Sequence, residues 1–326
     1  MKPRGQDFQG AMASDMHAFV AAKRALGRRY VCEEKQLRLF DAFLVQREVA
    51  SAADVTPALI EAFLASRPRA RPRSHNQLLG HVSRLFEWMV RQERLDRSPV
   101  RARPRRDSAR RIPFLIGPDD MQRLLDLVDT MVDNPLAPLR AATYKAIFIL
   151  LYGLGLRVGE VSRLQLADVD FGRRLLVIRN TKFGKTRLVP FGPRIGDMLH
   201  EYRKHRGENP APDTAFFSFT RRGPVHPGTI SQTFHHLVPR LCLVIPPGVA
   251  SPRVHDLRHA FAVGTLLRWY REGVDPAARL FHLSTFLGHV NPSSTAVYLT
   301  VTSELLTAAN RRFEGFAAPV LKGVAP

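Results

Sequence analysis

Residues 173–191 read RRLLVIRNTKFGKTRLVPF and contain the only clear β signal in this sequence. Two short runs rich in Leu, Val and Ile stand on either side of the polar turn TKFGK at 181–185. This pattern is typical of a β-hairpin, because branched residues favour strands and glycine permits a tight turn. Elsewhere the apolar residues recur at helical spacing. The sequence therefore predicts a mainly α protein with one small β-hairpin or sheet, an α+β fold.

Expected helices surround this hairpin. A strongly apolar helix over 140–152 precedes it, is broken by the glycines of 153–155, and is followed by a short helix over 157–166. Pro118 after a glycine predicts one more helix start upstream. Downstream, helices are expected over 193–206, 227–241, 255–271, 277–287, 293–299 and 303–313.

The first hundred residues predict a separate helical bundle. Thr56 followed by Pro57 is a strong start signal, an N-cap and a proline in the first turn. The chain has 326 residues, more than one hydrophobic core usually serves, so two domains are expected. The bundle helices are expected over about 12–26, 33–46, 57–67 and 74–92, and the predicted division is 1–95, 96–113 and 114–326.

The segment RLDRSPVRARPRRDSARRIP, residues 94–113, joins the two predicted domains. It carries eight arginines, two acids and three prolines, with little to bury, so an extended linker is expected. It can be a solvated charged tether or a strap along phosphates, which arginine pairs with well, and both interpretations stay open. The candidate DNA contacts in it are Arg101, Arg103, Arg105 and Arg106.

The overall charge favours a polyanionic partner. Lys and Arg total 49 against 29 acids, a formal charge of +20 and a pI near 11.1. Nucleic acid is the leading candidate, with a ribosomal protein, a membrane-surface protein or a generally basic proteome as alternatives. Cys32 and Cys242 are too few for a disulfide framework or a four-thiolate zinc site. With no apolar run of leader or membrane-span type, a cytoplasmic, nucleoid-associated protein is expected.

Two motifs suggest other chemistries when each is taken alone. GLGLRVGE at 153–160 is similar to a dinucleotide loop, but Val158 stands where that loop needs glycine. The glycines instead end one helix and let Arg157 project, with Glu160 three residues on to orient it or to form an ordinary surface pair. HDLRH at 255–259 has the histidine spacing of a zinc helix, but Asp256 replaces the required glutamate.

The motifs taken together have a definite order: Arg, Lys, His-x-x-Arg, His and Tyr. This order resembles that of the tyrosine recombinase (phage integrase) family. The resemblance covers about 114–313, whereas the N-terminal region matches that family's core-binding domain only in helix content and position. The matching strings are GLGLRVGEVSRLQLADVD, TKFGKTRLVP, HDLRHAFA and LGHVNPSSTAVYLTV.

The resemblance implies a role for each matching residue. Tyr298 would attack a backbone phosphate, leaving a 3′-phosphotyrosine and a free 5′-hydroxyl, while Arg157 and Arg258 clamp the non-bridging oxygens. Lys182 would be the general acid, His255 would assist proton transfer at the tyrosine, and His289 would donate a hydrogen bond to the phosphate. Glu160 and His259 would support these residues, with His259 buried and hydrogen bonded beneath the site.

The hairpin leaves the general acid open between two lysines. Lys182 stands at the family's position and is favoured over Lys185, which together with Arg187 would then contact phosphate. Phe183 replaces the glycine usual after the lysine, which stiffens the turn. No cofactor and no metal is implied, because arginines and a lysine supply the positive charge that the transition state needs.

The resemblance implies a site-specific recombinase for integration, excision or transposition of DNA. Its expected partners are duplex recombination sites, a homotetramer on synapsed DNA, and accessory proteins or a partner recombinase. Residues 303–326 would dock on a neighbouring protomer. The alternatives are a type IB topoisomerase-like enzyme that relaxes supercoils, and a DNA-binding protein that has lost cleavage.

Overall fold

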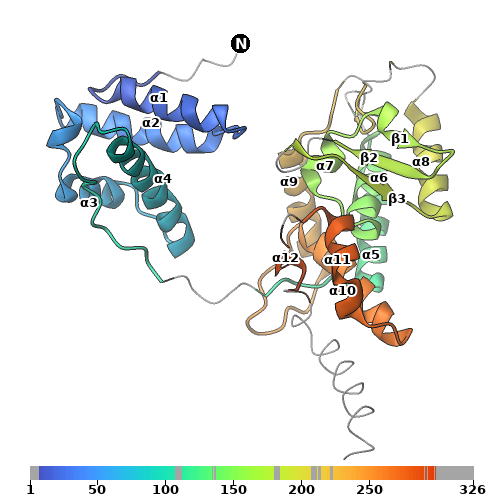
Figure 1. Cartoon of the computed structure of the whole chain (residues 1–326). Helices are drawn as coiled ribbons and strands as arrows, with labels where there is room; N and C mark the ends of the chain where they lie inside the picture. The colour runs from blue at the N-terminus through green and yellow to red at the C-terminus, as the bar shows by residue number, and fades with distance from the viewer. Residues whose placement is uncertain are drawn as a thin grey trace, which may run out of the picture. The chain divides into compact units, whose positions relative to one another are not determined.

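The computed structural model describes residues 7–106, 112–133, 135, 137–179, 184–206, 211, 214–220, 223–289, 291, 293–296 and 298. The chain divides into two compact units, Met1–Arg110 and Arg111–Pro326. Each unit encloses a hydrophobic core of its own. Helices dominate both units, and the one sheet of the described residues is small, so the predicted fold class is confirmed (Figure 1).

The first unit is a bundle of α1 (Ala13–Ala25), α2 (Val31–Gln46), α3 (Pro57–Ser66) and α4 (Pro72–Arg91), with the short 3-10 helix η1 (Ala52–Asp54) between α2 and α3. Its centre is aromatic: one phenylalanine from each helix is completely buried, and the rings of Phe63 and Phe86 both meet the Phe40 ring edge to face. The Thr56 hydroxyl accepts a hydrogen bond from Leu59 N at 3.3 Å, so α3 begins where the cap signal predicted. The four buried phenylalanines of the bundle are Phe19, Phe40, Phe63 and Phe86.

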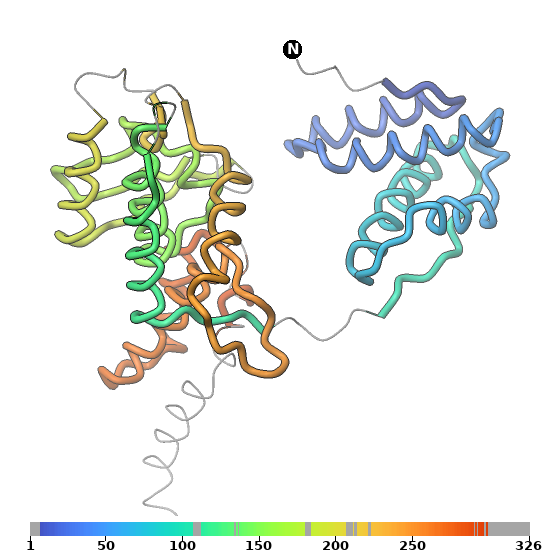
Figure 2. The backbone as a smooth tube through the Cα atoms, turned by 180° about the vertical axis from the view of Figure 1, so that it is seen from behind, coloured from blue at the N-terminus to red at the C-terminus, as the bar shows by residue number. Residues whose placement is uncertain are grey.

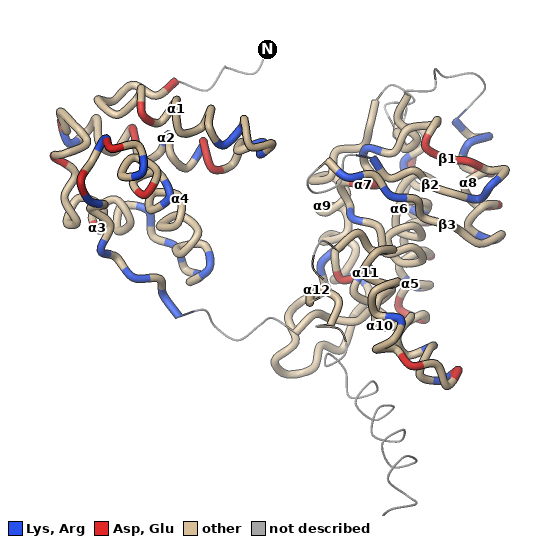
Figure 3. The backbone as a smooth tube through the Cα atoms, in the orientation of Figure 1, with Lys and Arg blue, Asp and Glu red and all other residues tan. Residues whose placement is uncertain are grey.

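The segment after α4 lies partly against this bundle. Val100 and Ala102 are half-buried on the bundle core. Arg105 N donates to Asn76 Oδ1 at 2.7 Å, and Asn76 Nδ2 donates back to Arg105 O at 2.7 Å. Residues 98–106 thus have no regular structure but are held to the first unit, and arginine positions, blue in Figure 3, recur along them.

The second unit is built around α6 (Arg140–Gly153), which α5 (Pro118–Asp129), α8 (Pro193–Arg206) and α10 (Asp256–Arg271) all contact (Figure 2). Its apolar sequence is explained by this position, since Ile147, Phe148 and Leu150 are completely buried. The remaining helices are α7 (Val158–Ser162), η2 (Leu166–Asp168), α9 (Pro227–Leu237), η4 (Val238–Leu241), α11 (Pro276–Leu287) and α12 (Ser293–Ala296).

An antiparallel sheet in the order β1-β2-β3 lies beside α8 (Figure 1). β2 (Leu175–Ile178) and β3 (Arg187–Pro190) are the predicted hairpin, with Leu176 opposite Val189 on the buried face and Ile178 opposite Arg187. β1 (Val169–Asp170) was not expected, because two residues are too short to give a periodicity. The connection at 180–183, and with it Lys182, lies outside the described residues.

Two expected helices differ from those observed. The helix expected over 157–166 ends at Ser162 as α7, and a separate 3-10 turn follows at Leu166–Asp168. The helix expected over 227–241 ends at Leu237 as α9, and the 3-10 helix η4 follows it. Of the helix expected over 293–299, the structure describes Ser293–Ala296 as α12. The tail at 303–326 lies outside the described residues. Among the helices that the structure describes, none is both long enough and apolar enough to span a bilayer.

Candidate active site

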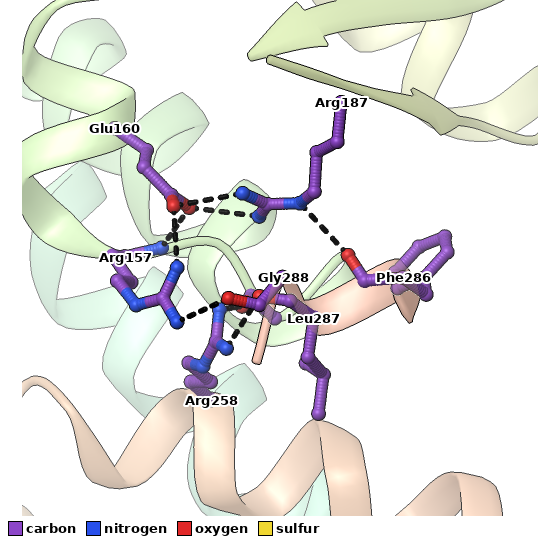
Figure 4. A network of polar contacts seen from close by, with 8 residues as sticks. Arg157, Glu160, Arg187, Arg258, Phe286, Leu287 and Gly288 are labelled. Atoms are coloured by element: carbon purple, nitrogen blue, oxygen red, sulfur yellow. Dashed lines mark hydrogen bonds and ion pairs between the residues drawn. The ribbon is translucent and has the colours of Figure 1, made fainter. Parts of the chain in front are cut away.

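Arg157 stands at the N-terminus of α7 and is held there by Glu160. The Arg157 backbone N donates to Glu160 Oε2 at 2.9 Å, and its guanidinium Nη1 donates to Glu160 Oε1 at 2.7 Å. A carboxylate three residues into a helix reaches back to the start of the helix in this way. The other end of the guanidinium donates from Nη2 to Gly288 O at 3.0 Å (Figure 4). Glu160 therefore orients Arg157 toward the turn after α11.

Arg187 of β3 binds the same carboxylate from the other side. Its Nη1 and Nη2 donate to Glu160 Oε1 and Oε2 at 2.8 and 2.9 Å, and its Nε donates to Phe286 O at 2.9 Å (Figure 4). Glu160 is 2% exposed, which alone would raise its pKa, but the hydrogen bonds and charges of Arg187 and Arg157 lower the pKa to about 2. Arg187, with 11% side-chain exposure, thus supports Glu160 from within, and its contact with phosphate stays a prediction.

Arg258 lies on α10 with its side chain almost completely buried. Nη1 donates to Gly155 O and Nη2 to Leu287 O, each at 2.6 Å, while the buried Nε finds no partner among the described residues. Burial, followed by the positive charge of Arg157, lowers its pKa to about 9. Gly155 has φ +59°, and a Cβ there would lie 2.5 Å from the Phe261 ring, so glycine is required for this approach.

The two arginines meet at one turn. Arg157 donates to Gly288 O and Arg258 to Leu287 O, although the two arginines come from different helices (Figure 4). The next residue in the chain is His289. Its Nδ1 lies 2.7 Å from Thr295 Oγ1, and its ring stacks on Tyr298 with centroids 6.4 Å apart. The long-range contacts thus bring two guanidiniums, an imidazole and a phenol to a single place.

Tyr298 is buried, with only 3% of its surface exposed, and packs with apolar residues of α10 and α11. Its hydroxyl is hydrogen bonded to His259 Nδ1 at 2.8 Å. Burial raises the pKa of the phenol, and the charges of Arg258 and Arg157 oppose that rise. The nucleophile candidate is therefore held by a histidine that the sequence placed only in support.

His255, the histidine predicted to act at the tyrosine, occupies a different place. Its side chain is exposed, and its ring meets the His259 ring edge to face with centroids 4.8 Å apart. Within the described part of the chain, no hydrogen bond joins it to Tyr298. Partial desolvation, then the charges of His259 and Arg258, lower its pKa to about 4. His255 thus lies beside His259 rather than on the phenol.

The remaining predicted residues are distributed as follows. Lys185 is exposed at the start of the return to β3, and its rival Lys182 is not among the described residues, so the choice between them stays a prediction. Arg101, Arg103, Arg105 and Arg106 are exposed and belong to the first unit. The contacts that sequence reasoning missed are Arg187 with Glu160 and His259 with Tyr298. Neither pair has a fixed spacing, so only the folded chain could reveal them.

Comparison with known proteins places these residues in a family. The model described as the phage integrase family matches residues 115–304. A putative integrase/recombinase, y4rB of Sinorhizobium fredii, is 36% identical over 301 residues, 91% of this chain and 95% of the relative. Tyrosine recombinase XerC of Myxococcus xanthus is 29% identical over 275 residues, 82% of this chain and 85% of the relative.

Solved structures share the fold. The Tn1549 transposon integrase in complex with circular intermediate DNA has a TM-score of 0.63 at 18% identity, covering 92% of this chain and 99% of that chain. A lambda integrase dimer bound to a COC′ core site has a TM-score of 0.62 at 17% identity, covering 87% and 76%. At these identities the likeness shows the fold alone.

Proposed function

The chain belongs to the phage integrase family, and from that premise we propose that Tyr298 is the nucleophile with which it cuts and rejoins DNA. The family makes the protein a tyrosine recombinase, an enzyme that breaks and rejoins DNA strands. One observation carries the assignment: Arg157 and Arg258 both bind the turn at Leu287 and Gly288, next to which His289 and Tyr298 stack on each other.

The two arginines suit a pentavalent phosphate. The transition state carries extra negative charge on its equatorial oxygens, and guanidinium groups that are already oriented stabilise that charge at little reorganisation cost. Arg258 donates one N–H from each Nη to a carbonyl, and its buried Nε has no partner among the described residues, so three of its five N–H groups remain for phosphate oxygens. Arg157 is 30% exposed, so its outer edge is open to a ligand. We assign both to the non-bridging oxygens.

The reaction needs one proton removed and one supplied. When the Tyr298 oxygen bonds to phosphorus, the bond from phosphorus to the 5′-oxygen breaks, which gives a 3′-phosphotyrosine and a 5′-hydroxyl. Lys182 is proposed to protonate the leaving oxygen, since a 5′-alkoxide leaves poorly without a proton. His289, neutral because burial and the nearby arginines lower its pKa to about 4, is proposed to donate to the phosphate. The bond energy stays in the phosphotyrosine, so rejoining needs no external energy source.

The rest of the chain is assigned to the DNA and to assembly. We propose that the bundle at 1–95 and the arginines of 96–113 hold duplex DNA while the unit at 114–326 performs the chemistry. A homotetramer on two synapsed sites, a docking role for 303–326, accessory proteins or a partner recombinase, and a nucleoid-associated cytoplasmic location belong to the same proposal. The net charge of +20 supports a polyanionic partner.

The test is to trap the covalent intermediate. A duplex selected by binding from a random pool, nicked near the cleavage point so that the cut end is lost, is expected to form a protein–DNA adduct that survives denaturant. Tyr298→Phe should abolish the adduct and keep DNA binding, because only the hydroxyl is lost. Tyr270→Phe, a half-buried tyrosine on α10, is the matched control and should react normally.

Three outcomes would contradict this assignment. Adduct formation by Tyr298→Phe would move the nucleophile elsewhere. Tight binding of the selected DNA without an adduct in the wild type would favour a DNA-binding protein that has lost cleavage. Relaxation of supercoiled plasmid with no exchange between paired sites would favour an enzyme of the topoisomerase type.

A further inference from the structure

A hydrogen bond joins the hydroxyl of the buried Tyr298 to the imidazole of His259. The two atoms, Tyr298 Oη and His259 Nδ1, are 2.8 Å apart, within the range of a strong hydrogen bond. The tyrosine is 3% exposed and the histidine side chain 18% exposed, so bulk water has little access to the phenolic proton. Among the described residues, His259 is the proton acceptor positioned at this phenol.

The far nitrogen of the same ring faces a carboxylate. His259 Nε2 lies 3.8 Å from Asp256 Oδ1, and the Asp256 side chain is completely buried. A carboxylate on that side favours the tautomer with its proton on Nε2, which leaves the Nδ1 lone pair directed at the tyrosine. Asp256 is beyond hydrogen-bond distance and acts on the ring through its charge, whereas His259 contacts the nucleophile directly.

The charges around His259 keep the ring neutral. Burial first, then Arg253 and Arg258, lower its pKa to about 4, while Asp256 faces it from its own helix. The remaining titratable neighbours are His255, whose ring lies edge to face with it, and Tyr298 itself. A neutral imidazole can accept a proton, whereas a protonated one would hold the phenol as a donor and block it.

We propose that His259 is the general base that accepts the Tyr298 proton when the tyrosine attacks DNA. In this step the phenolic proton moves to His259 Nδ1, the Tyr298 oxygen bonds to phosphorus, and the bond to the 5′-oxygen breaks. The leaving oxygen takes its proton from the general acid. During rejoining, His259 returns its proton to the tyrosine. Asp256 is a positioning residue that sets the tautomer, and His255 is left to act on the phosphate side.

This proposal rests on the assignment of Tyr298 as the nucleophile. The critical variant is His259→Asn, because the asparagine side chain reaches the position of Nδ1 and can keep a hydrogen bond but cannot take the proton. We expect the affinity for DNA and the temperature of thermal unfolding to stay near the wild-type values. The rate of adduct formation should fall by roughly 100-fold or more. His282→Asn, an exposed histidine of α11, is the matched control and should cleave at the wild-type rate.

The pH profile distinguishes a base from a packing residue. The wild-type rate of adduct formation should be flat between about pH 6 and pH 8, because a base of low pKa is fully neutral there. Without the base, the phenol must ionise before it attacks, so the rate of His259→Asn should rise about tenfold per pH unit. A slow variant with a flat profile would mean that His259 only positions the tyrosine and would overturn the proposal.

A more acidic phenol gives an independent test. Incorporation of 3-fluorotyrosine, which ionises more easily, at all six tyrosines should restore much of the rate lost in His259→Asn. The same substitution in His255→Asn should restore little, because that residue is assigned to the phosphate side. Rescue of His255→Asn but not of His259→Asn would make His255 the base instead.

The two failures are separable. No adduct with the wild-type protein removes the proposed function itself. A wild-type adduct that His259→Asn forms just as fast leaves the function intact and removes only the role of His259.

Discussion

Glu160 organises the site from a buried position. Its two carboxylate oxygens accept hydrogen bonds from Arg157 and, in bidentate fashion, from Arg187, and its side chain is 2% exposed. A buried carboxylate is stable only when partners replace its lost water, and here two guanidiniums do so. The same contacts fix the direction of Arg157. Stability and phosphate clamping therefore depend on one side chain.

Replacement of Glu160 by Gln is expected to change how the stability of the second unit depends on pH. The folded-state pKa of Glu160, about 2, is below its ordinary value of 4.5. Its contribution to stability is therefore present above about pH 4.5 and is lost as the pH falls toward 2. Glu160→Gln should lower the free energy of unfolding at pH 7 by on the order of 3 kcal/mol and remove most of this acid dependence.

Urea unfolding followed by tryptophan fluorescence measures this change. The chain has two tryptophans, so in a Trp88→Phe background Trp269 of α10 reports the second unit alone. Glu201→Gln, which breaks an exposed pair with Lys204 on α8, is the matched control and should cost well under 1 kcal/mol. The prediction would be contradicted if the free energy of unfolding fell equally with decreasing pH in Glu160→Gln and in the wild type.

The C-terminal end of α11 is where strand, helix and site meet. Gly288 ends the helix with φ 67° and ψ 43°, the left-handed conformation that glycine adopts at low cost. Its carbonyl accepts from Arg157, and a Cβ on it would lie 2.9 Å from Nη1 of Arg187. The turn that delivers His289 to the site is thus packed directly on the network of Glu160.

Gly288→Ala is expected to impair both stability and cleavage. The left-handed conformation alone costs an alanine on the order of 1 kcal/mol, and the displaced Arg187 adds to this. Gly273→Ala is a matched control: Gly273 follows α10 with φ +71° and has nothing within 4 Å of its Cβ position.

Thermal unfolding and adduct rates should separate the two variants. Both variants are expected to be less stable than the wild type, because an alanine is strained in the left-handed conformation. Only Gly288→Ala should also slow adduct formation, by roughly tenfold or more, because the phosphate clamp moves. Equal adduct rates for the two variants would show that the turn tolerates a side chain.

The whole molecule is a polycation in two units joined by a basic segment. Arg101, Arg103, Arg105 and Arg106 are exposed on the part of that segment that is held to the first unit. A phosphate contact releases counterions, so it raises affinity at low salt and steepens the salt dependence of binding. A segment that binds phosphates and a plain tether therefore predict different salt dependences of DNA binding.

Changing the four arginines to Gln is expected to weaken DNA binding without loss of the fold. For each arginine that contacts a phosphate, the slope of log K against log salt should become shallower by about 0.9. Fluorescence anisotropy at several salt concentrations measures the slope. Arg268→Gln with Arg271→Gln, exposed positions at the end of α10, controls for a general loss of charge. An unchanged slope in the fourfold variant would make the segment a tether only.

The sequence by itself determined the elements and the order of the chemical groups. Helix boundaries follow from local signals, such as Thr56 before Pro57, and helices such as α6 and α8 lie where the apolar spacing predicted them. The hairpin of β2 and β3 follows from its branched residues. Local propensity and periodicity act over a few neighbouring residues, so one sequence is enough to read them.

The tertiary structure alone decided which partner each group has. Arg187, expected to contact phosphate, binds Glu160 and the carbonyl of Phe286. The Tyr298 hydroxyl is hydrogen bonded to His259 rather than to His255. His255 and His259 lie one helical turn apart in the motif HDLRH, and the motif does not tell which of them contacts the tyrosine. Which of them faces Tyr298 depends on how α10 packs against the chain after α11, a long-range contact that no local pattern encodes.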